Sequence, residues 1–207
     1  MGADGTEKRL AKLEARPEPV EIDLSRTALI IVDMQNAFAG RGEGSGPVEP
    51  AINGNLIERV KSLVETARTA AIKVVYLKMM KDPERKSKSL IRTADDTKIV
   101  DELSPLSGDI VIHKTWYSGF RGTSLDRILR ESRIEHLIFA GVVTNVCVES
   151  TLRDSYFLDY LPILVSDATN NAGPLFTQQA TEWNVESSFG WVATTGHVLK
   201  ALSLSEK

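Results

Sequence analysis

The chain has 207 residues, of which 42% are hydrophobic and 26% charged, and it carries a net charge of −3 with a pI near 5.7. This composition is typical of one globular domain, and the slightly acidic balance argues against nucleic acid or an anionic membrane as a partner. No apolar run approaches the ~20 residues of a membrane span. A single cysteine and the lack of a signal-peptide core favour a cytoplasmic location.

The beginning of the chain is polar and charged, and we predict an N-terminal arm over residues 1–20, followed by a single domain over residues 21–207. Within the arm, Glu7–Arg16 has the spacing of a short helix with Leu10 and Leu13 on one side, and two prolines end it. We expect this arm to be frayed or to pack on a neighbouring subunit.

After the arm, short apolar runs alternate with helical patterns as far as residue 202. This alternation predicts an open, mostly parallel six-stranded sheet with helices on both faces, a three-layer α/β fold. The predicted strands cover residues 27–33, 73–79, 109–113, 136–140, 161–166 and 190–194. The predicted helices cover residues 53–71, a stretch capped by Thr123, and residues 146–158, 174–188 and 198–202. Residues 40–50, which are rich in glycine, and the polar residues 81–98 are predicted to be loops.

Three chemically versatile side chains follow three of the predicted strands. Asp33 ends the first strand, Lys114 follows the third, and Cys147 lies beyond the fourth, where a helical pattern begins. Because the carboxyl ends of parallel strands meet at one edge of a sheet, we expect the three side chains to lie together. The helix dipole and the free amides at that helix start would lower the pKa of the Cys147 thiol. The competing interpretation is a buried structural cysteine.

This combination suits a thiol nucleophile, which needs a proton acceptor and an electrostatic partner. Asp33 can take the thiol proton and pass it to a leaving amine, while Lys114 stabilises the charged arrangement. The backbone N–H groups of Val143 and Cys147 can bind the oxyanion of a tetrahedral intermediate. The residues therefore predict acyl transfer from an amide carbonyl to sulfur, followed by hydrolysis of the thioester.

The histidines do not support a histidine-dependent or metal-dependent mechanism. His136 begins a strand at the opposite edge of the sheet, strand alternation points His113 away from the Lys114 face, and His197 follows the last strand. No two histidines have the spacing of metal ligands, so we predict no metal and no cofactor. A nucleotide-dependent oxidoreductase would need a Gly-x-Gly-x-x-Gly turn after the first strand, where Asp33–Asn36 stands instead.

Three motifs, in this order, resemble those of the isochorismatase-like cysteine hydrolases over nearly the whole chain. They are Ile31–Phe38 (IVDMQNAF), Lys114–Thr123 (KTWYSGFRGT) and Gly141–Val148 (GVVTNVCV). The resemblance implies the family's six-stranded sheet, a catalytic triad of the three side chains described above, and a homo-oligomer, either a dimer or a tetramer. It also implies a non-proline cis peptide bond, Val142–Val143.

Within that family, the C-terminal half is most similar to members that release a carbamate from a ureido group, in stretches such as Thr144–Asp154 (TNVCVESTLRD) and Phe189–Val192 (FGWV). This implies a metal-free amidohydrolase that cleaves a C–N bond of a small ureido, carbamoyl or amide substrate, with ureidoacrylate-type compounds favoured. The alternatives are an amidase for another small carboxamide and a non-catalytic binding protein on the same fold. The candidate substrate contacts are Asn36, Phe38, Trp116, Tyr117, Phe120 and Thr144.

Two other activities of the family fit less well. Its nicotinamidases hold a metal with an aspartate and two histidines, whereas residues 40–100 contain no histidine. Its isochorismate-cleaving members do not need a cysteine, so Cys147 favours the amidase branch. The two predicted loops differ from those of the ureide-cleaving relative, which leaves the individual substrate open.

Overall fold

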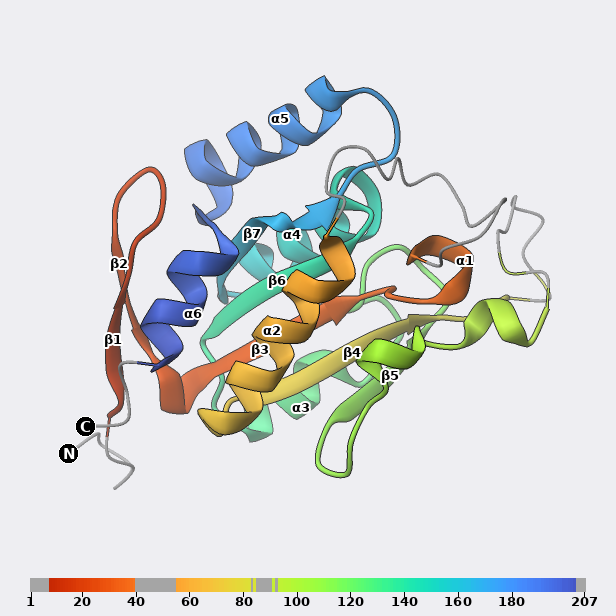
Figure 1. Cartoon of the computed structure of the whole chain (residues 1–207), viewed down its shortest axis with the longest axis horizontal. Helices are drawn as coiled ribbons and strands as arrows, with labels where there is room; N and C mark the ends of the chain where they lie inside the picture. Colours follow the sequence, from red (N-terminus) through yellow and green to blue (C-terminus); the bar gives the residue numbers. More distant parts are fainter. Residues whose placement is uncertain (1–7, 40–54, 83, 85–90, 92, 204–207) are drawn as a thin grey trace.

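The computed structural model describes residues 8–39, 55–82, 84, 91 and 93–203 (Figure 1). It confirms the six-stranded sheet, with strand order β5-β4-β3-β6-β7-β8 and every neighbouring pair parallel. The strands are β3 (Thr27–Val32), β4 (Lys73–Met79), β5 (Ile110–Lys114), β6 (His136–Val142), β7 (Leu161–Asn170) and β8 (Trp191–Ala193). The predicted loop over residues 40–50 lies outside the described residues.

Helices cover both faces of this sheet (Figure 1). They are α1 (Asn36–Ala39), α2 (Leu56–Thr69), α3 (Leu125–Glu131), α4 (Glu149–Phe157), α5 (Leu175–Asn184) and α6 (Thr195–Ser203). Helices α2 and α6 pack on one face, and α3 and α4 pack on the other, so each face has its own hydrophobic core. Every residue of β3 and β6 is buried, as expected for central parallel strands covered on both sides. None of the described helices is both long and apolar enough to cross a membrane.

Short helical turns connect these elements, and three element boundaries differ from the predicted ones. The turns are the 3-10 turns η1 (Leu24–Arg26), η2 (Asp95–Thr97) and η3 (Asp101–Leu103) and the π-helical turns η4 (Thr144–Val148) and η5 (Val185–Phe189). The helix predicted over residues 146–158 thus begins as a π-turn. The helix predicted over residues 174–188 ends as one. Strand β7 runs four residues past its predicted end, because the register against β6 shifts between Phe139 and Gly141.

The predicted N-terminal helix is wrong. Instead, β1 (Leu10–Leu13) pairs antiparallel with β2 (Val20–Asp23), and β1 lies against α6 of the same chain. Burial along β1 alternates with a period of two: Leu13 is fully buried, whereas 52% of Leu10 is exposed. Two backbone hydrogen bonds between Arg16 and Val192 of β8 hold the hairpin on the domain. As a strand, residues 10–13 pair their backbone N–H and C=O groups with β2 and bury every second side chain. A helix this short would be unstable on its own.

Replacing Leu13 with alanine tests this hairpin. We expect the free energy of unfolding to fall by about 2–3 kcal/mol, because the change leaves a cavity in the core beside α6. Leu10→Ala is the matched control, since that side chain faces solvent, and it should change the free energy by less than about 0.5 kcal/mol. Urea denaturation of the two variants gives both values. Equal effects would contradict the alternation of β1.

Candidate active site

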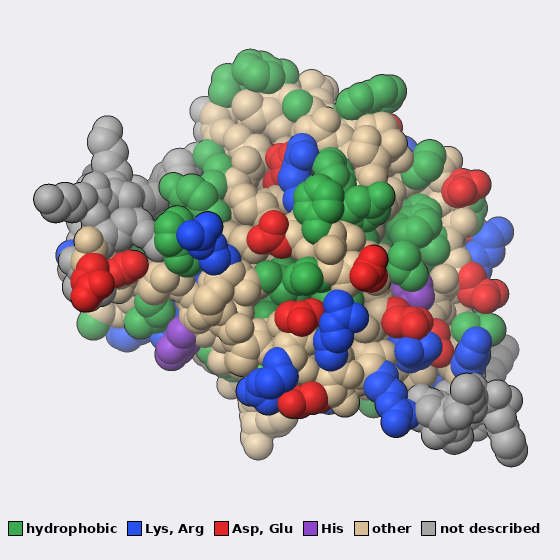
Figure 2. Space-filling view, turned by 180° about the vertical axis from the view of Figure 1, so that it is seen from behind, with side chains coloured by type: hydrophobic (Ala, Val, Ile, Leu, Met, Phe, Trp, Pro, Cys, Tyr) green, Lys and Arg blue, Asp and Glu red, His purple; other side chains and the backbone are tan. Residues whose placement is uncertain are grey.

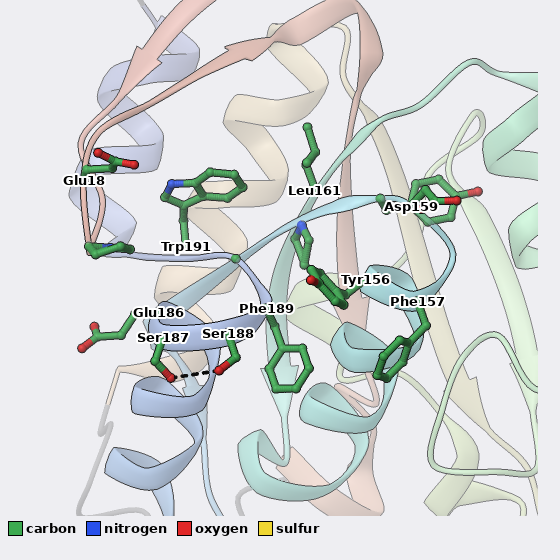
Figure 3. Close-up of a pocket in the computed structure, with 14 residues that line it drawn as sticks. Glu18, Tyr156, Phe157, Asp159, Leu161, Glu186, Ser187, Ser188, Phe189 and Trp191 are labelled. Atoms are coloured by element: carbon green, nitrogen blue, oxygen red, sulfur yellow. Dashed lines mark hydrogen bonds between the residues drawn. The ribbon is translucent and has the colours of Figure 1, made fainter.

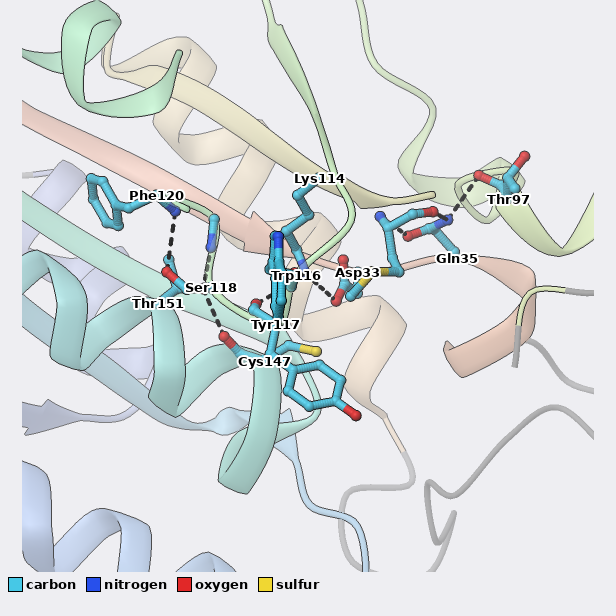
Figure 4. Close-up of polar contacts among 12 residues, drawn as sticks. Asp33, Gln35, Thr97, Lys114, Trp116, Tyr117, Ser118, Phe120, Cys147 and Thr151 are labelled. Carbon is cyan, nitrogen blue, oxygen red and sulfur yellow. Dashed lines mark hydrogen bonds and ion pairs between the residues drawn. The ribbon is translucent and has the colours of Figure 1, made fainter. Parts of the chain in front are cut away.

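The structure brings Asp33, Lys114 and Cys147 together at the carboxyl edge of the sheet, just beyond β3, at the end of β5 and beyond β6 (Figure 4). The Lys114 Nζ atom lies 2.7 Å from the Asp33 Oδ2 atom, and both side chains are essentially inaccessible to solvent. A buried ion pair is costly to form and is tolerated only when its remaining hydrogen-bonding groups are satisfied. The contacts of each partner therefore decide what the pair can do.

The ammonium group of Lys114 is held by three acceptors. Besides Asp33, it donates to the backbone carbonyl of Trp116 at 3.2 Å and to that of Tyr117 at 3.1 Å. Since a lysine ammonium has three N–H donors, these contacts use all of them. The loop that follows β5 thus fixes the cation in one place beside the carboxylate.

The carboxylate of Asp33 has one oxygen engaged and one available. Its Oδ1 atom is buried and has no hydrogen-bond partner among the described residues. Burial raises the pKa of Asp33 above its usual value, and this effect outweighs the opposing charge of Lys114. A carboxylate with a raised pKa is a stronger base, so Asp33 can accept a proton from a neighbouring thiol.

The thiol of Cys147 differs from the sequence prediction. Burial raises the pKa of Cys147, and the negative charge of Asp33 raises it further, whereas Lys114 and the backbone N–H of Val143 act in the opposite direction. The predicted lowering by the helix start is therefore wrong, because the desolvation of the sulfur exceeds the effect of the nearby amides. The raised pKa keeps the proton on the resting thiol, so a nucleophilic sulfur would need a neighbouring base to remove it.

The turn that carries Cys147 is shaped by its backbone. Gly141 has a φ of +113°, and a Cβ there would lie 2.2 Å from the Val32 carbonyl oxygen of the neighbouring strand, so only glycine fits. The Val142–Val143 peptide bond is cis, at the position that the family resemblance implies. Asn145 then forms two hydrogen bonds of 2.9 Å with the backbone of Ala172. These contacts tie the turn to β3 and to the segment before α5.

The candidate substrate contacts divide into two groups, the first of which lies around the triad. Trp116 and Tyr117 stand on the loop that holds Lys114, and both rings are partly exposed (Figure 4). The guanidinium of Arg121 lies 3.7 Å from the centre of the Trp116 ring. Thr144 is buried next to the cis bond, and its hydroxyl has no partner among the described residues. Of these three candidates, Trp116 and Tyr117 present exposed side chains near the triad, whereas Thr144 is enclosed.

The second group has other partners. The Asn36 side chain donates to the backbone and side chain of Asp95 and so holds the η2 turn in place. The Phe120 ring stacks on Tyr160 with ring centres 5.8 Å apart and points away from the triad (Figure 4). Phe38 packs against the core beside α2. For these residues, packing and anchoring explain the side chain without a ligand.

Sequence reasoning missed two buried side chains that support the site. Gln35 donates to the backbone carbonyls of Met79 and Thr97 and accepts from the Met79 amide, so it clamps the end of β4 and the η2 turn beside Asp33. Thr151 bonds the backbone of both Gly119 and Cys147. Gln35 lies inside the first motif and could have been suspected there. Nothing in the sequence pattern distinguishes Thr151 from an ordinary helix residue.

A hollow lies at the opposite edge of the sheet from Asp33, Lys114 and Cys147 (Figure 3). Among the predicted site residues, Phe120 comes near it, because its ring stacks on Tyr160 in the wall. The hollow has a volume of about 640 Å³ and is bounded by the starts of β7 and β8 and by the end of α4. Three rings, those of Tyr156, Phe157 and Phe189, contact one another edge to face on its wall. None of the three triad residues lines it.

A model of the isochorismatase domain matches residues 27–197 of the chain. Ureidoacrylate amidohydrolase RutB of Caulobacter segnis is 44% identical over 88% of both chains. The RutB of Yersinia enterocolitica is 42% identical over 87% of this chain and 91% of its own.

Solved structures agree with the fold. A cysteine hydrolase from Pseudomonas syringae superimposes with a TM-score of 0.81 at 27% identity, covering 97% of this chain and all of its own. The N-carbamoylsarcosine amidase of Thermoplasma acidophilum superimposes with a TM-score of 0.72, also at 27% identity, over 82% of this chain and 96% of its own. Both names describe hydrolases, and the second describes one that acts on a carbamoyl compound.

Proposed function

Because this chain belongs to the isochorismatase family, we propose that it is a cysteine amidohydrolase acting on small ureido acids of the ureidoacrylate type. The observation that carries the proposal is the buried Lys114–Asp33 pair, whose carboxylate is close enough to the Cys147 thiol to interact with it. The relatives at 42–44% identity carry the name of that activity. Asp33, Lys114 and Cys147 supply a base, a fixed cation and a nucleophile, which is what acyl transfer to sulfur requires.

In the first half of the proposed reaction, Asp33 removes the thiol proton while the Cys147 sulfur attacks the ureido carbonyl carbon. Negative charge then develops on the carbonyl oxygen, and the backbone N–H groups of Val143 and Cys147 bind it. As the intermediate collapses, the bond between the carbonyl carbon and the substituted nitrogen breaks. Asp33 gives its proton to that nitrogen, so the amine leaves and a carbamoyl group remains bound to sulfur.

In the second half, water replaces the amine. Asp33 is again ionised and takes a proton from water, whose oxygen attacks the carbamoyl carbon. The C–S bond breaks, the proton on Asp33 returns to sulfur, and carbamate is released, which decomposes to carbon dioxide and ammonia. Throughout, the fixed ammonium of Lys114 stabilises the charged form of Asp33. The side chains of Trp116, Tyr117 and Thr144 are the candidate contacts for the remainder of the substrate.

A panel of substrates tests the function. Purified protein is incubated with ureidoacrylate, with saturated N-carbamoyl amino acids and with simple carboxamides, and ammonia and carbon dioxide are measured. We expect both products from the ureido acids, at rates that a metal chelator leaves unchanged. Equal rates on the simple carboxamides would move the assignment to a general amidase. No turnover of any member would support a binding protein on this fold.

We also propose that the protein acts in the cytoplasm as a homo-oligomer. Support for self-association comes from the face covered by α3 and α4, where hydrophobic side chains gather among charged ones (Figure 2). Phe157 on this side is 72% exposed and Tyr156 is 44% exposed, and large exposed rings of this kind are typical of subunit contacts. Sedimentation analysis would give the subunit number, and a monomer at all concentrations would contradict the proposal.

A further inference from the structure

Thr151 lies on α4, one helical turn after Cys147, and is completely buried. Its hydroxyl donates to the Cys147 carbonyl oxygen at 2.7 Å and accepts from the Gly119 amide at 3.1 Å (Figure 4). The first bond is common for threonine inside a helix. The second joins residues that are 32 positions apart and serves no helix, so helix formation alone does not explain it.

The amide that Thr151 holds belongs to the loop that fixes Lys114. Trp116 and Tyr117 supply the two carbonyls that bind the ammonium group, and Gly119 follows two residues later. The carbonyl of Gly119 is held as well, by the hydroxyl of Thr123 at 2.6 Å. Gly119 is therefore anchored on both sides of its backbone, once by each threonine.

Side chains pack closely against the Gly119 backbone at this contact. A Cβ on Gly119 would lie 2.4 Å from the Leu77 Cδ1 atom and 3.2 Å from the Thr151 Cγ2 atom, so the loop lies directly on these two side chains. Leu77 is itself buried in the core. If the hydroxyl of Thr151 were removed, the buried Gly119 amide would lose its acceptor, and the loop would have to move to recover one.

We propose that Thr151 is a positioning residue whose hydroxyl couples the Lys114 loop to the Cys147 turn and so sets the geometry between the cation–carboxylate pair and the sulfur. The inference rests on the proposed function for its catalytic consequence, but the coupling itself concerns the protein alone. Since the hydroxyl uses its proton on one segment and a lone pair on the other, a side chain without both functions cannot replace it.

Thr151→Val removes the hydroxyl and keeps the shape, and Thr151→Ser keeps the hydroxyl. We expect kcat to fall about 10- to 100-fold in the valine variant with little change in KM, because small displacements of reacting groups have effects of this size. The serine variant should stay within about threefold of the wild type. In the valine variant the acid limb of the pH profile should move to higher pH, since a loosened Lys114 stabilises the Asp33 carboxylate less.

Thr27→Val is the matched control. Thr27 is also buried and donates to a backbone carbonyl, that of Asp23, but it lies at the opposite end of β3. The Thr27→Val variant should lose stability, but the pH profile of its activity should not shift. The proposal would be overturned by an unchanged pH profile in Thr151→Val or by an equal shift of the profile in Thr27→Val. It would also be overturned if Thr151→Ser lost as much activity as Thr151→Val.

A second readout keeps the test independent of turnover. The rate at which iodoacetamide alkylates Cys147 is measured against pH, which needs no substrate. Because Lys114 lowers the pKa of the thiol, its displacement in Thr151→Val should raise that pKa and slow alkylation at a given pH. A protein that turns over no ureide but shows this shift refutes the proposed function and supports the coupling. Identical alkylation profiles for the wild type and Thr151→Val refute the coupling.

Discussion

Replacing Cys147 with serine or alanine is expected to lower kcat on ureido acids by about 10⁴-fold or more, since the loss of a nucleophile removes the covalent route altogether. The expectation follows from the site: the raised pKa of Asp33 suits it to accept the proton of a thiol, but a serine hydroxyl is far less acidic. Quenched-flow kinetics and mass spectrometry of the intact protein measure the effect. The wild type should gain the mass of one carbamoyl group during turnover, and neither variant should.

The variants should fold normally, because Cys147 is a small side chain that forms no disulfide, and serine and alanine are of similar or smaller size. Thermal unfolding provides that control. An alanine variant that turns over ureides at the wild-type rate would exclude the thioester route, even if the protein remained an amidohydrolase. A carbamoyl group found on another residue would have the same consequence.

The sequence predicts the sheet and the meeting of the three side chains for the same physical reason. Apolar runs that are buried on both faces can only be central strands, and a polar residue directly after such a run has to lie at the edge of the sheet. Asp33 and Lys114 follow from that argument without knowledge of any partner. The resemblance to a family adds the order of the motifs and the class of substrate.

Other features depend on tertiary packing and are not encoded in local patterns. The sequence Leu10–Leu13 has helical spacing, but pairing with β2 and contact with α6 make it a strand. The pKa of Cys147 depends on how deeply the sulfur is buried, which no local pattern gives. Likewise, Asn36 looks like a substrate contact until Asp95, far along the chain, is seen to accept its side-chain hydrogen bonds.

Replacing Lys114 with methionine is the second change with a large expected effect. It leaves Asp33 buried without its counter-charge, and removing one partner of a buried ion pair typically costs about 3–5 kcal/mol of unfolding free energy. Activity should fall at least about 100-fold, because a protonated Asp33 cannot take the thiol proton. Urea denaturation and steady-state kinetics measure the two effects.

The stability of Lys114→Met should also depend on pH in a defined direction. Burial already raises the pKa of Asp33 in the wild type, and loss of the lysine charge raises it further. The folded variant therefore binds the Asp33 proton more tightly than the unfolded chain does. Its stability is greatest below the pKa of an unfolded aspartate and decreases as the pH rises through the higher folded pKa. The deficit relative to the wild type should accordingly be smaller near pH 4 than near pH 8.

A double variant separates lost charge from lost packing. In Asp33→Asn with Lys114→Met, neither side chain can carry a charge, so the double variant should be more stable than Lys114→Met alone at pH 8 and should lose the pH dependence. Asp33→Asn alone is the complementary control, because it leaves the lysine charge buried. If the double variant were less stable than the wild type by the sum of the losses measured for Lys114→Met and Asp33→Asn alone, the pair would not be coupled. The 2.7 Å contact between Nζ and Oδ2 would then be a consequence of the fold and not the electrostatic centre of the site.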